Sequence, residues 1–524
     1  MISRHYHTAS PSEPRLCACK GGSCRKLLHL YPFILAAVLF FTFVVRDVIF
    51  YEEQQHAPFV SGRRFMGVAR ITEVQLDPGL VANKPDSVVF KDDALFCNRS
   101  HMRTDVCVAK GDVRVLGGDQ GGRLYKVLVY AEGGVKNREE RIKPYTRKWE
   151  ESVMKTIDEV KIIRKSKPSI SEKSESVDDV RPKCDVQHSV PGIIFSTGGY
   201  TGNVYHEFND GLIPLFITAH KYRHGYAFGG QVVLLLLEYH HWWISKYAEI
   251  LGQLTNYTII DLGADKRVHC FPEVTVGLNI HDELAITSQP NDSEDPARGP
   301  SMAGFQSMLH AAYLPRLPSA MAKQQTDIDG MIKEPSTQSF KPKLVIISRN
   351  GPRALLNQAE IVALAEGIGF SVRVLSPTQT TEMIDIYAAL NGCDTMIGVH
   401  GAAMTHLLFM RPGATFIQIV ALGTDWAAET YYGEPARKLG LRYVQYKVSP
   451  RESSLWGQYP PDDPVLTDPD TVNSRGWWET KRVYLEGQNV TVALPRIAAI
   501  LHSAFSDASN LRSTALHSEA RLPA

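Results

Sequence analysis

Between residues 341 and 420 the chain alternates short apolar runs with amphipathic segments. Four runs rich in Val, Ile and Leu are typical of strands buried in a parallel sheet, and they span 343–348, 370–375, 395–399 and 415–420. Apolar residues at helical spacing between them predict helices, which span 357–367, 380–390 and 402–410. Strands and helices that alternate through short loops indicate right-handed βαβ units around a parallel sheet.

A second alternating region lies between residues 184 and 318. The predicted strands span 192–196, 231–237 and 257–261. The predicted helices span 203–223, which contains Pro214, and 241–251. Two α/β regions in one chain predict a cleft between two domains, which is where ligands usually bind.

The first strongly apolar segment of the chain, residues 27–45, has no charged residue. About 19 residues are enough to span a bilayer as a helix. Basic residues dominate before the segment and acidic residues follow it, which predicts a cytosolic tail over 1–26, a signal-anchor and a lumenal remainder. A cleaved signal peptide or a buried core helix are the alternatives, but no small-residue cleavage motif follows. Residues 46–95 are mixed and interrupted by Pro, and we interpret them as a stem.

Two further segments lack a sustained apolar face. Residues 155–183 are rich in Lys, Ser, Glu and Asp, which predicts a flexible surface excursion. A basic partner-binding patch is the alternative, weakened by the interspersed acidic residues. Residues 506–524 are also polar, and we expect them to form a disordered tail.

The overall composition narrows the class of protein. The 524 residues include 57 Lys and Arg and 56 Asp and Glu, a net charge of +1, which argues against a nucleic-acid partner. Hydrophobic residues at 44% and charged residues at 22% indicate a folded core and exclude a wholly disordered chain.

A lumenal location changes which modifications of the cysteines and asparagines are expected. Disulfides become possible, and Cys97 and Cys107 are spaced to close a short loop, whereas Cys393 beside an apolar strand suits a buried thiol. Four N-x-Ser/Thr sequences become candidate glycosylation sites on exposed loops: Asn98, Asn256, Asn291 and Asn489.

Two turns after predicted strands carry groups suited to phosphate. His400 and Gly401 lie between a strand and a helix, where the free N–H groups of a helix start favour an anion. Arg349 and Arg353 bracket a turn after another strand, and the arginine fork matches phosphate oxygens. We expect both turns at one sheet edge. The alternative for His400 is a tight turn in which its side chain forms only local hydrogen bonds. The alternative for the arginines is a solvated surface loop.

A third motif, Gly198 to Pro214, leads from a Gly-rich turn into a helix. His206, Glu207 and Asp210 share its first turns, and such groups can abstract a proton from a substrate. Helix capping and ordinary surface charge are the alternative. The chain contains no G-x-x-x-x-G-K-[ST], G-x-S-x-G or H-E-x-x-H sequence.

Together these motifs resemble glycosyltransferase family 61. The resemblance rests on Gly398-Val-His-Gly-Ala-Ala-Met-Thr-His, Asn203-Val-Tyr-His-Glu-Phe-Asn-Asp and Tyr431-Tyr-Gly-Glu-Pro-Ala. Cys107 with Gly111-Asp-Val-Arg-Val, and Glu452-Ser-Ser-Leu, resemble the grass xylan arabinosyl- and xylosyltransferases of that family. The similar region extends from about Cys97 to Leu501.

The resemblance implies a GT-B fold, with two Rossmann-like domains facing across a cleft behind a Golgi signal-anchor. Residues 96–330 would form the acceptor-side domain and 331–505 the nucleotide-sugar-binding domain. It also implies an inverting mechanism, with Asp210 as the base and His206 as the second choice. Arg349 and Arg353 would neutralise the diphosphate. The residues implied to hold the nucleotide or phosphates at the helix start are His400, Gly401 and Thr405.

The implied reaction moves a pentose, xylose or arabinofuranose, from a UDP-sugar to the xylan backbone. The expected partners are UDP-xylose or UDP-arabinofuranose as donor, xylan as acceptor and the Golgi membrane. No cofactor or metal is demanded, because dipoles and basic side chains commonly stabilise the diphosphate in this fold. The alternatives are a β-1,2-xylosyltransferase acting on N-glycans and a catalytically silent member that binds polysaccharide or acts as a scaffold in a synthase complex.

Overall fold

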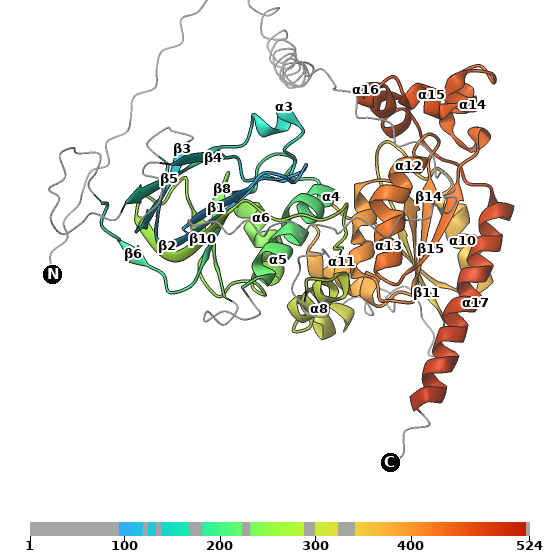
Figure 1. The fold of residues 1–524 in the computed structure, drawn as a ribbon. Helices are drawn as coiled ribbons and strands as arrows, with labels where there is room; N and C mark the ends of the chain where they lie inside the picture. Colours follow the sequence, from blue (N-terminus) through green and yellow to red (C-terminus); the bar gives the residue numbers. More distant parts are fainter. Residues whose placement is uncertain are drawn as a thin grey trace, which may run out of the picture. The chain divides into compact units, whose positions relative to one another are not determined.

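The computed structural model describes residues 94–118, 124–132, 138–166, 181–222, 231–287, 299–322 and 341–519. These residues form a mixed α/β structure with one sheet in each half of the chain (Figure 1). The predicted tail, signal-anchor and nearly all of the stem lie outside the described residues. Within those ranges, no helix combines the length and the apolar character needed to cross a membrane.

The C-terminal half contains a five-stranded parallel sheet in the order β12-β11-β13-β14-β15. Its strands are β11 (Lys343–Ile347), β12 (Ser371–Leu375), β13 (Thr395–Val399), β14 (Thr415–Val420) and β15 (Arg442–Lys447). The four predicted strands are confirmed, and β15 is the addition. The helices between them include α10 (Gln358–Ile368) and α11 (Met383–Asn391). The chain runs from β11 outward to β12 and then returns to the other side of β11, so the strand order reverses between β11 and β13. Open α/β sheets bind ligands at the carboxyl ends of strands where the order reverses.

The N-terminal half contains a ten-stranded mixed sheet. Its strands are β1 (Leu95–Asn98), β2 (Val106–Leu116), β3 (Leu124–Ala131), β4 (Glu139–Ile142), β5 (Glu159–Ser166), β6 (Val186–Gln187), β7 (Gly192–Ser196), β8 (Val233–Leu237), β9 (Ile260–Asp261) and β10 (Val268–Val276). β10, β7, β8 and β9 form a parallel arrangement of the kind expected of a Rossmann-like domain, and β6 with β10 and β3 with β5 are further parallel pairs. β2 pairs antiparallel with β1, β3 and β10, so the expectation of a second Rossmann-like sheet is wrong for this part.

The expected excursion over 155–183 is wrong for its first part. Residues Glu159–Ser166 form β5, which pairs with β3 and β4. Val160 and Ile162 are fully buried and alternate with half-buried residues. This period of two is typical of a strand with one buried face. Residues 167–180 lie outside the described residues.

The expected disordered tail is helical. Helix α17 runs from Leu494 to Glu519, beyond the predicted boundary at 505, and packs against α10. Its buried residues Ile497, Leu501, Ala504 and Ala508 recur every three or four positions, so the apolar face continues past that boundary. Residues 520–524 lie outside the described residues.

The two halves share a buried core between their helices. The predicted helix over 203–223 consists of three consecutive segments: α4 (Val204–His206), a π-helix η2 (Glu207–Leu212) and α5 (Ile213–His220). These segments and α8 (Met302–Tyr313) contribute to one apolar cluster with α11 and the 3-10 helix η4 (Ala402–Phe409). The rings of Phe208 and Phe409 lie 5.8 Å apart across this junction. The motif at 203–210 is therefore held against the motif at 397–406.

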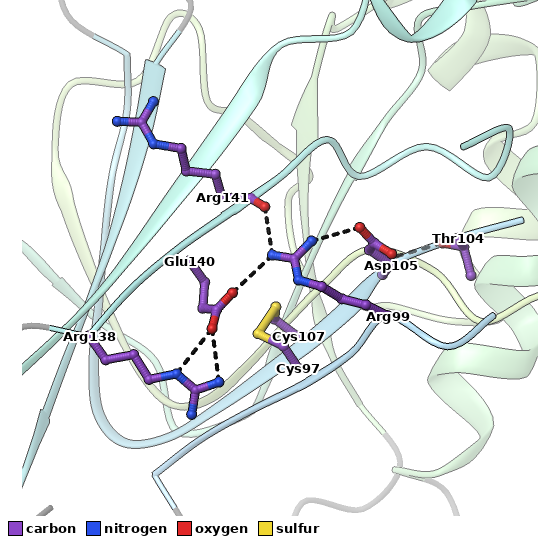
Figure 2. Close-up of a disulfide and its surroundings, with 8 residues drawn as sticks. All are labelled: Cys97, Arg99, Thr104, Asp105, Cys107, Arg138, Glu140 and Arg141. Atoms are coloured by element: carbon purple, nitrogen blue, oxygen red, sulfur yellow. Dashed lines mark hydrogen bonds and ion pairs between the residues drawn. A yellow bond between two sulfur atoms is a disulfide. The ribbon is translucent and has the colours of Figure 1, made fainter. Parts of the chain in front are cut away.

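The Cys97–Cys107 disulfide is present, and it joins opposite residues of β1 and β2 (Figure 2). Ion pairs hold the loop that it closes: Arg99 lies 2.7 Å from a carboxylate oxygen of Asp105 and 3.0 Å from one of Glu140. A second disulfide, Cys184–Cys270, was not predicted, and Cys393 is a buried free thiol as expected.

We expect Cys97→Ser/Cys107→Ser to lower the free energy of unfolding by about 2–3 kcal/mol, because the cross-link restricts a loop of ten residues in the unfolded chain. Urea unfolding followed by far-UV circular dichroism measures the change. Cys393→Ser, which removes a thiol outside any disulfide, is the control under reducing and oxidising conditions. A double variant as sensitive to reductant as the native protein would contradict the prediction.

Candidate active site

Two arginines and one histidine meet where the C-terminal sheet reverses its strand order. Arg349 and Arg353 follow β11, and His400 follows β13. Arg349 donates from Nη1 to the backbone carbonyl oxygen of His400 over 3.2 Å, and Arg353 donates from Nε to the same oxygen over 3.0 Å. The expectation that both turns lie at one sheet edge is confirmed, because β11 and β13 are parallel neighbours.

The arginine pair has no acidic partner in contact with it in the part of the chain that the structure describes. Among those residues, neither guanidinium forms an ion pair with a carboxylate, and the buried Nε of Arg349 has no hydrogen-bond acceptor. Burial lowers the pKa of Arg349, and burial together with the charge of Arg349 lowers the pKa of Arg353 to about 10. Two adjacent, partly desolvated cations favour an anion.

The backbone of both turns is closely fitted to the guanidinium groups. Gly401 has a φ of 154°, a backbone conformation that residues with a side chain rarely adopt, so glycine is favoured there. Arg353 has a φ of 60°, a left-handed conformation that costs free energy in a residue with a side chain. Its backbone N–H donates to the carbonyl oxygen of Gln488 over 2.6 Å, which holds that conformation. Such strain is often kept at functional sites.

His400 is held as a neutral hydrogen-bond donor. Gln418 donates from Nε2 to Nδ1 of His400 over 2.9 Å, and the Tyr443 hydroxyl donates to Oε1 of Gln418 over 2.6 Å. Burial, with the charges of Arg353 and Arg349, lowers the pKa of His400 to about 3. The proton therefore lies on Nε2, which remains able to donate to a phosphate oxygen.

Thr405 lies in η4 but is fully buried, beside the hydroxyl of Tyr432. Its hydroxyl oxygen is buried and has no hydrogen-bond partner among the described residues. The expected contact of Thr405 with the nucleotide or phosphates stays a prediction.

A second group of functional side chains lies on α4 and η2. Nδ1 of His206 lies 2.6 Å from Oδ2 of Asp210, so the two predicted catalytic residues are brought together. The helix that carries them includes a π-helical turn, a distortion that frequently occurs at functional sites. Asn203 caps the helix by accepting a hydrogen bond from the backbone N–H of Tyr205 over 3.0 Å.

The two predicted catalytic residues differ in burial, and the choice of the base between them stays a prediction. The Asp210 side chain is 1% exposed, whereas that of His206 is 16% exposed. Burial alone would raise the pKa of Asp210, but the hydrogen bond from His206 and the charges of Arg147 and Arg103 hold it below the usual value. A carboxylate that is buried and so well paired is a poor base. It can instead orient His206 so that Nε2 faces a substrate hydroxyl, as an acidic residue does beside a catalytic histidine.

Glu207 has a structural role in the same segment. Its carboxylate accepts hydrogen bonds from the backbone N–H of Gly202 over 2.6 Å and from the indole of Trp243. Burial raises the pKa of Glu207 to about 7. These contacts tie the Gly-rich turn to the helix.

The sequence analysis missed the two arginines that surround Asp210. Nη2 of Arg103 lies 3.4 Å from Oδ1 of Asp210, and Nη1 of Arg147 lies 3.2 Å from Oδ2. Arg103 also pairs with Glu283 at 2.8 Å. Both arginines lie in loops, 107 and 63 residues before Asp210, so no spacing rule could have indicated them.

Aromatic side chains connect the two groups. The ring of Tyr205 lies 5.3 Å from Tyr431 and 6.1 Å from Tyr432, and Tyr432 lies 5.5 Å from His400. Tyr431 and Tyr432 belong to a second π-helix, η5 (Glu429–Gly433). Aromatic contacts therefore link the segment that carries the base candidate to the arginine pair.

A separate pocket of about 420 Å³ is lined by β2, β6 and β10 residues. This pocket includes His188, which precedes β7, whereas His206 follows β7. The pocket and His206 therefore lie at opposite ends of that strand. Its two arginines, Arg114 and Arg181, both pair with Asp112. Their charge is therefore partly compensated, whereas neither Arg349 nor Arg353 forms an ion pair with a carboxylate among the described residues.

Three of the predicted glycosylation asparagines lie within the described residues. Asn98 and Asn256 are exposed. Asn489 is half-buried, and its side-chain oxygen accepts a hydrogen bond from the backbone N–H of Ala354 over 2.9 Å, so the expectation of an exposed loop is wrong there. Asn291 lies outside the described residues.

An enzyme that transfers a moiety from a phosphate-activated donor needs cationic groups for the phosphate and a group that accepts a proton. Arg349 and Arg353 supply groups of the first kind, and the pair of His206 and Asp210 supplies groups of the second kind. The sequence profile described as Glycosyltransferase 61 matches residues 205–417. This match contains every predicted catalytic and phosphate-binding residue. The chain belongs to glycosyltransferase family 61.

Three relatives illustrate the similarity. Xylan glycosyltransferase MUCI21 of Arabidopsis thaliana is 45% identical over 416 residues, which cover 79% of this chain and 80% of the relative. Beta-1,2-xylosyltransferase XYXT1 of Oryza sativa subsp. japonica is 36% identical, covering 78% of this chain and 83% of the relative. Alpha-1,3-arabinosyltransferase XAT3 of the same species is 33% identical, covering 87% and 72%.

Proposed function

We propose that this chain is an inverting glycosyltransferase that moves a pentose, xylose or arabinofuranose, from a UDP-sugar to the xylan backbone during cell-wall synthesis. The names of its relatives, which include xylan, xylosyl- and arabinosyltransferases, support the substrate class. The observation that carries the proposal is the pair of arginines beside His400, partly or fully buried and without an ion pair to a carboxylate among the described residues, because it suits a compact and doubly charged anion such as a diphosphate.

In the proposed reaction, Nε2 of His206 accepts the proton of an acceptor hydroxyl. The hydroxyl oxygen forms a bond to the anomeric carbon of the pentose from the side opposite the leaving group. The bond between that carbon and the UDP oxygen breaks, and UDP leaves with the electron pair, so the configuration inverts. Arg349, Arg353 and the Nε2–H group of His400 stabilise the negative charge that grows on the diphosphate. Asp210 holds His206 in the required tautomer.

Within this proposal the fold is of GT-B type, with the parallel C-terminal sheet as the nucleotide-sugar half. The arginines supply the charge neutralisation, so we propose that transfer needs no metal or other cofactor. Activity that persists in excess EDTA supports this part, and activity restored only by a divalent cation contradicts it.

We further propose a Golgi location as a single-pass type II membrane protein. The support is the apolar segment 27–45 with basic residues before it and acidic residues after it. Asn98 and Asn256 are the proposed glycan carriers, since both are exposed. A mobility shift after peptide N-glycosidase treatment, lost in Asn98→Gln/Asn256→Gln, tests both the proposed location and the proposed glycosylation sites.

The experiment that tests the function uses secreted protein that lacks residues 1–50. UDP-xylose and UDP-arabinofuranose are each offered with xylohexaose or with an N-glycan, and products are identified by mass spectrometry and linkage analysis. We expect one pentose to be added to xylohexaose. Transfer of the pentose to the N-glycan alone would contradict xylan as the acceptor and indicate an N-glycan instead. Binding of xylohexaose without UDP binding or transfer would favour a catalytically silent member.

A further inference from the structure

An exposed stack of aromatic and arginine side chains continues outward from His206. The Tyr200 ring stacks on His206 with their centroids 4.4 Å apart. The Arg147 guanidinium lies 5.3 Å from the Tyr200 ring and 4.8 Å from the Trp149 ring. Trp149 is 45% exposed and Tyr200 is 38% exposed, although both carry large aromatic side chains. The stack therefore joins the candidate base to an exposed indole two residues before helix α3 (Glu151–Met154), which is labelled in Figure 1.

The indole of Trp149 contacts two guanidinium groups and still remains partly exposed. Arg103 and Arg147 lie over this ring, at 5.1 and 4.8 Å from its centroid. Both guanidinium groups also contact the buried carboxylate of Asp210, which fixes their positions beside the ring. A ligand can contact Trp149 through the part of the residue that remains exposed.

Charge excludes a phosphate at this stack. Arg103 pairs with Asp210 and Glu283, and Arg147 pairs with Asp210 and Glu150. Three carboxylates thus compensate two guanidinium groups, in contrast to the uncompensated pair Arg349 and Arg353. A flat apolar surface without net positive charge suits a neutral ligand.

Rigidity of the stack also favours ligand binding. The Tyr200 hydroxyl donates to Glu150 over 2.8 Å, and Glu150 accepts from Arg147. The rings are therefore held before any ligand arrives, which reduces the entropy lost on binding. Exposed aromatic side chains held in this way commonly mark a binding surface.

We propose that Trp149 and Tyr200 form the acceptor subsite, on which the backbone of a β-1,4-linked xylan chain lies with its sugar rings stacked on the aromatic rings. A xylopyranose ring carries no exocyclic CH2OH group and exposes C–H bonds on both faces, so it fits a flat aromatic surface. The chain would pass His206 because Tyr200 contacts both His206 and the outer part of the stack. This inference rests on the proposed function for the identity of the acceptor.

The test compares Trp149→Ala, Trp149→Tyr and wild-type protein. We expect Trp149→Ala to raise the KM for xylohexaose by about 10- to 30-fold and to leave the KM for the UDP-sugar within about twofold. Trp149→Tyr keeps a flat ring and should recover most of the affinity. Wild-type protein should bind xylohexaose more tightly than xylotriose, and Trp149→Ala should lose most of that difference.

Tyr257→Ala is the matched control. Tyr257 is 42% exposed and follows Asn256, which hydrogen-bonds Gln231 just before β8 begins, so it lies at the opposite edge of the sheet from the stack. This variant should match wild-type protein in every measurement.

Binding measured without turnover separates this inference from the proposed function. Calorimetry with xylohexaose and no donor should detect binding by wild-type protein and its loss in Trp149→Ala, even if no pentose transfer is found. Unchanged xylohexaose binding in Trp149→Ala would overturn the inference, and so would equal loss of donor and acceptor affinity, which would indicate a merely structural role. Tighter binding of cellohexaose than of xylohexaose would overturn the choice of ligand.

Discussion

Replacing Asp210 by asparagine is expected to lower kcat by about 10³- to 10⁴-fold, a loss of the size seen when a catalytic histidine is held in the wrong tautomer. The amide introduced by Asp210→Asn can turn its NH2 group toward His206, and Nδ1 would then accept a hydrogen bond in place of donating one. Nε2 of His206 would carry the proton and could no longer accept one from the acceptor. UDP affinity should stay within about twofold, because the phosphate-binding residues lie on the other half of the chain.

His206→Ala should cause a similar loss, and the double variant should be little worse than either single variant, since the two residues act as a unit. The measurements are single-turnover rates with the saturating donor and acceptor pair found in the screen, together with calorimetric UDP titration. The thermal midpoint of each variant is recorded because Asp210→Asn leaves Arg103 and Arg147 without part of their counter-charge.

Asp394→Asn is the control for this experiment. Its carboxylate is 9% exposed and lies 3.3 Å from Arg411, but it precedes β13 and so lies at the sheet edge opposite His400. We expect lower stability with kcat preserved. If Asp210→Asn kept full activity while His206→Ala lost it, the positioning role of Asp210 would be wrong.

The second large effect is expected for the arginine pair. Arg349→Gln and Arg353→Gln should each lower kcat/KM by about 10²- to 10³-fold, because each removes a group that stabilises the leaving diphosphate. Lysine should not substitute fully for either, since it lacks the planar fork. The KM for the acceptor should change little.

Stability should move in the opposite direction from activity. Burial and mutual repulsion lower the pKa of Arg353, so its charged form is disfavoured in the ligand-free protein. Arg349→Gln removes one of two like charges, and we expect its thermal midpoint without ligand to rise while the stabilisation by UDP disappears. Thermal unfolding with and without UDP measures both effects.

Arg411→Gln serves as the matched control on the same sheet, because Arg411 pairs with Asp394 and lies at the opposite edge. It should keep UDP-dependent stabilisation. A ligand-free Arg349→Gln protein that is strongly destabilised would assign Arg349 a structural role and contradict the proposed phosphate site.

Periodicity alone predicted most of the C-terminal sheet. The strands at 343–348, 370–375, 395–399 and 415–420 are rich in apolar residues, because most of these residues are buried in a parallel sheet. The N-terminal sheet was harder to predict, since strands such as β5 alternate buried and polar residues and resemble charged surface segments. The antiparallel pairing of β2 with β10 joins residues far apart in the chain, which no local pattern reveals.

By itself the sequence determined the family, the shared sheet edge of the two turns that follow β11 and β13, and the nearness of His206 and Asp210, because each depends on residues close together in the chain or on the strand-to-helix order. Only the tertiary structure decided which of the two side chains is accessible. Loops from positions 103 and 147 bring two guanidinium groups onto Asp210, bury its carboxylate and leave His206 as the accessible member. The burial and the pKa of a side chain are set by neighbours in space, so residues 63 and 107 positions away produced a difference between His206 and Asp210 that the sequence could not show.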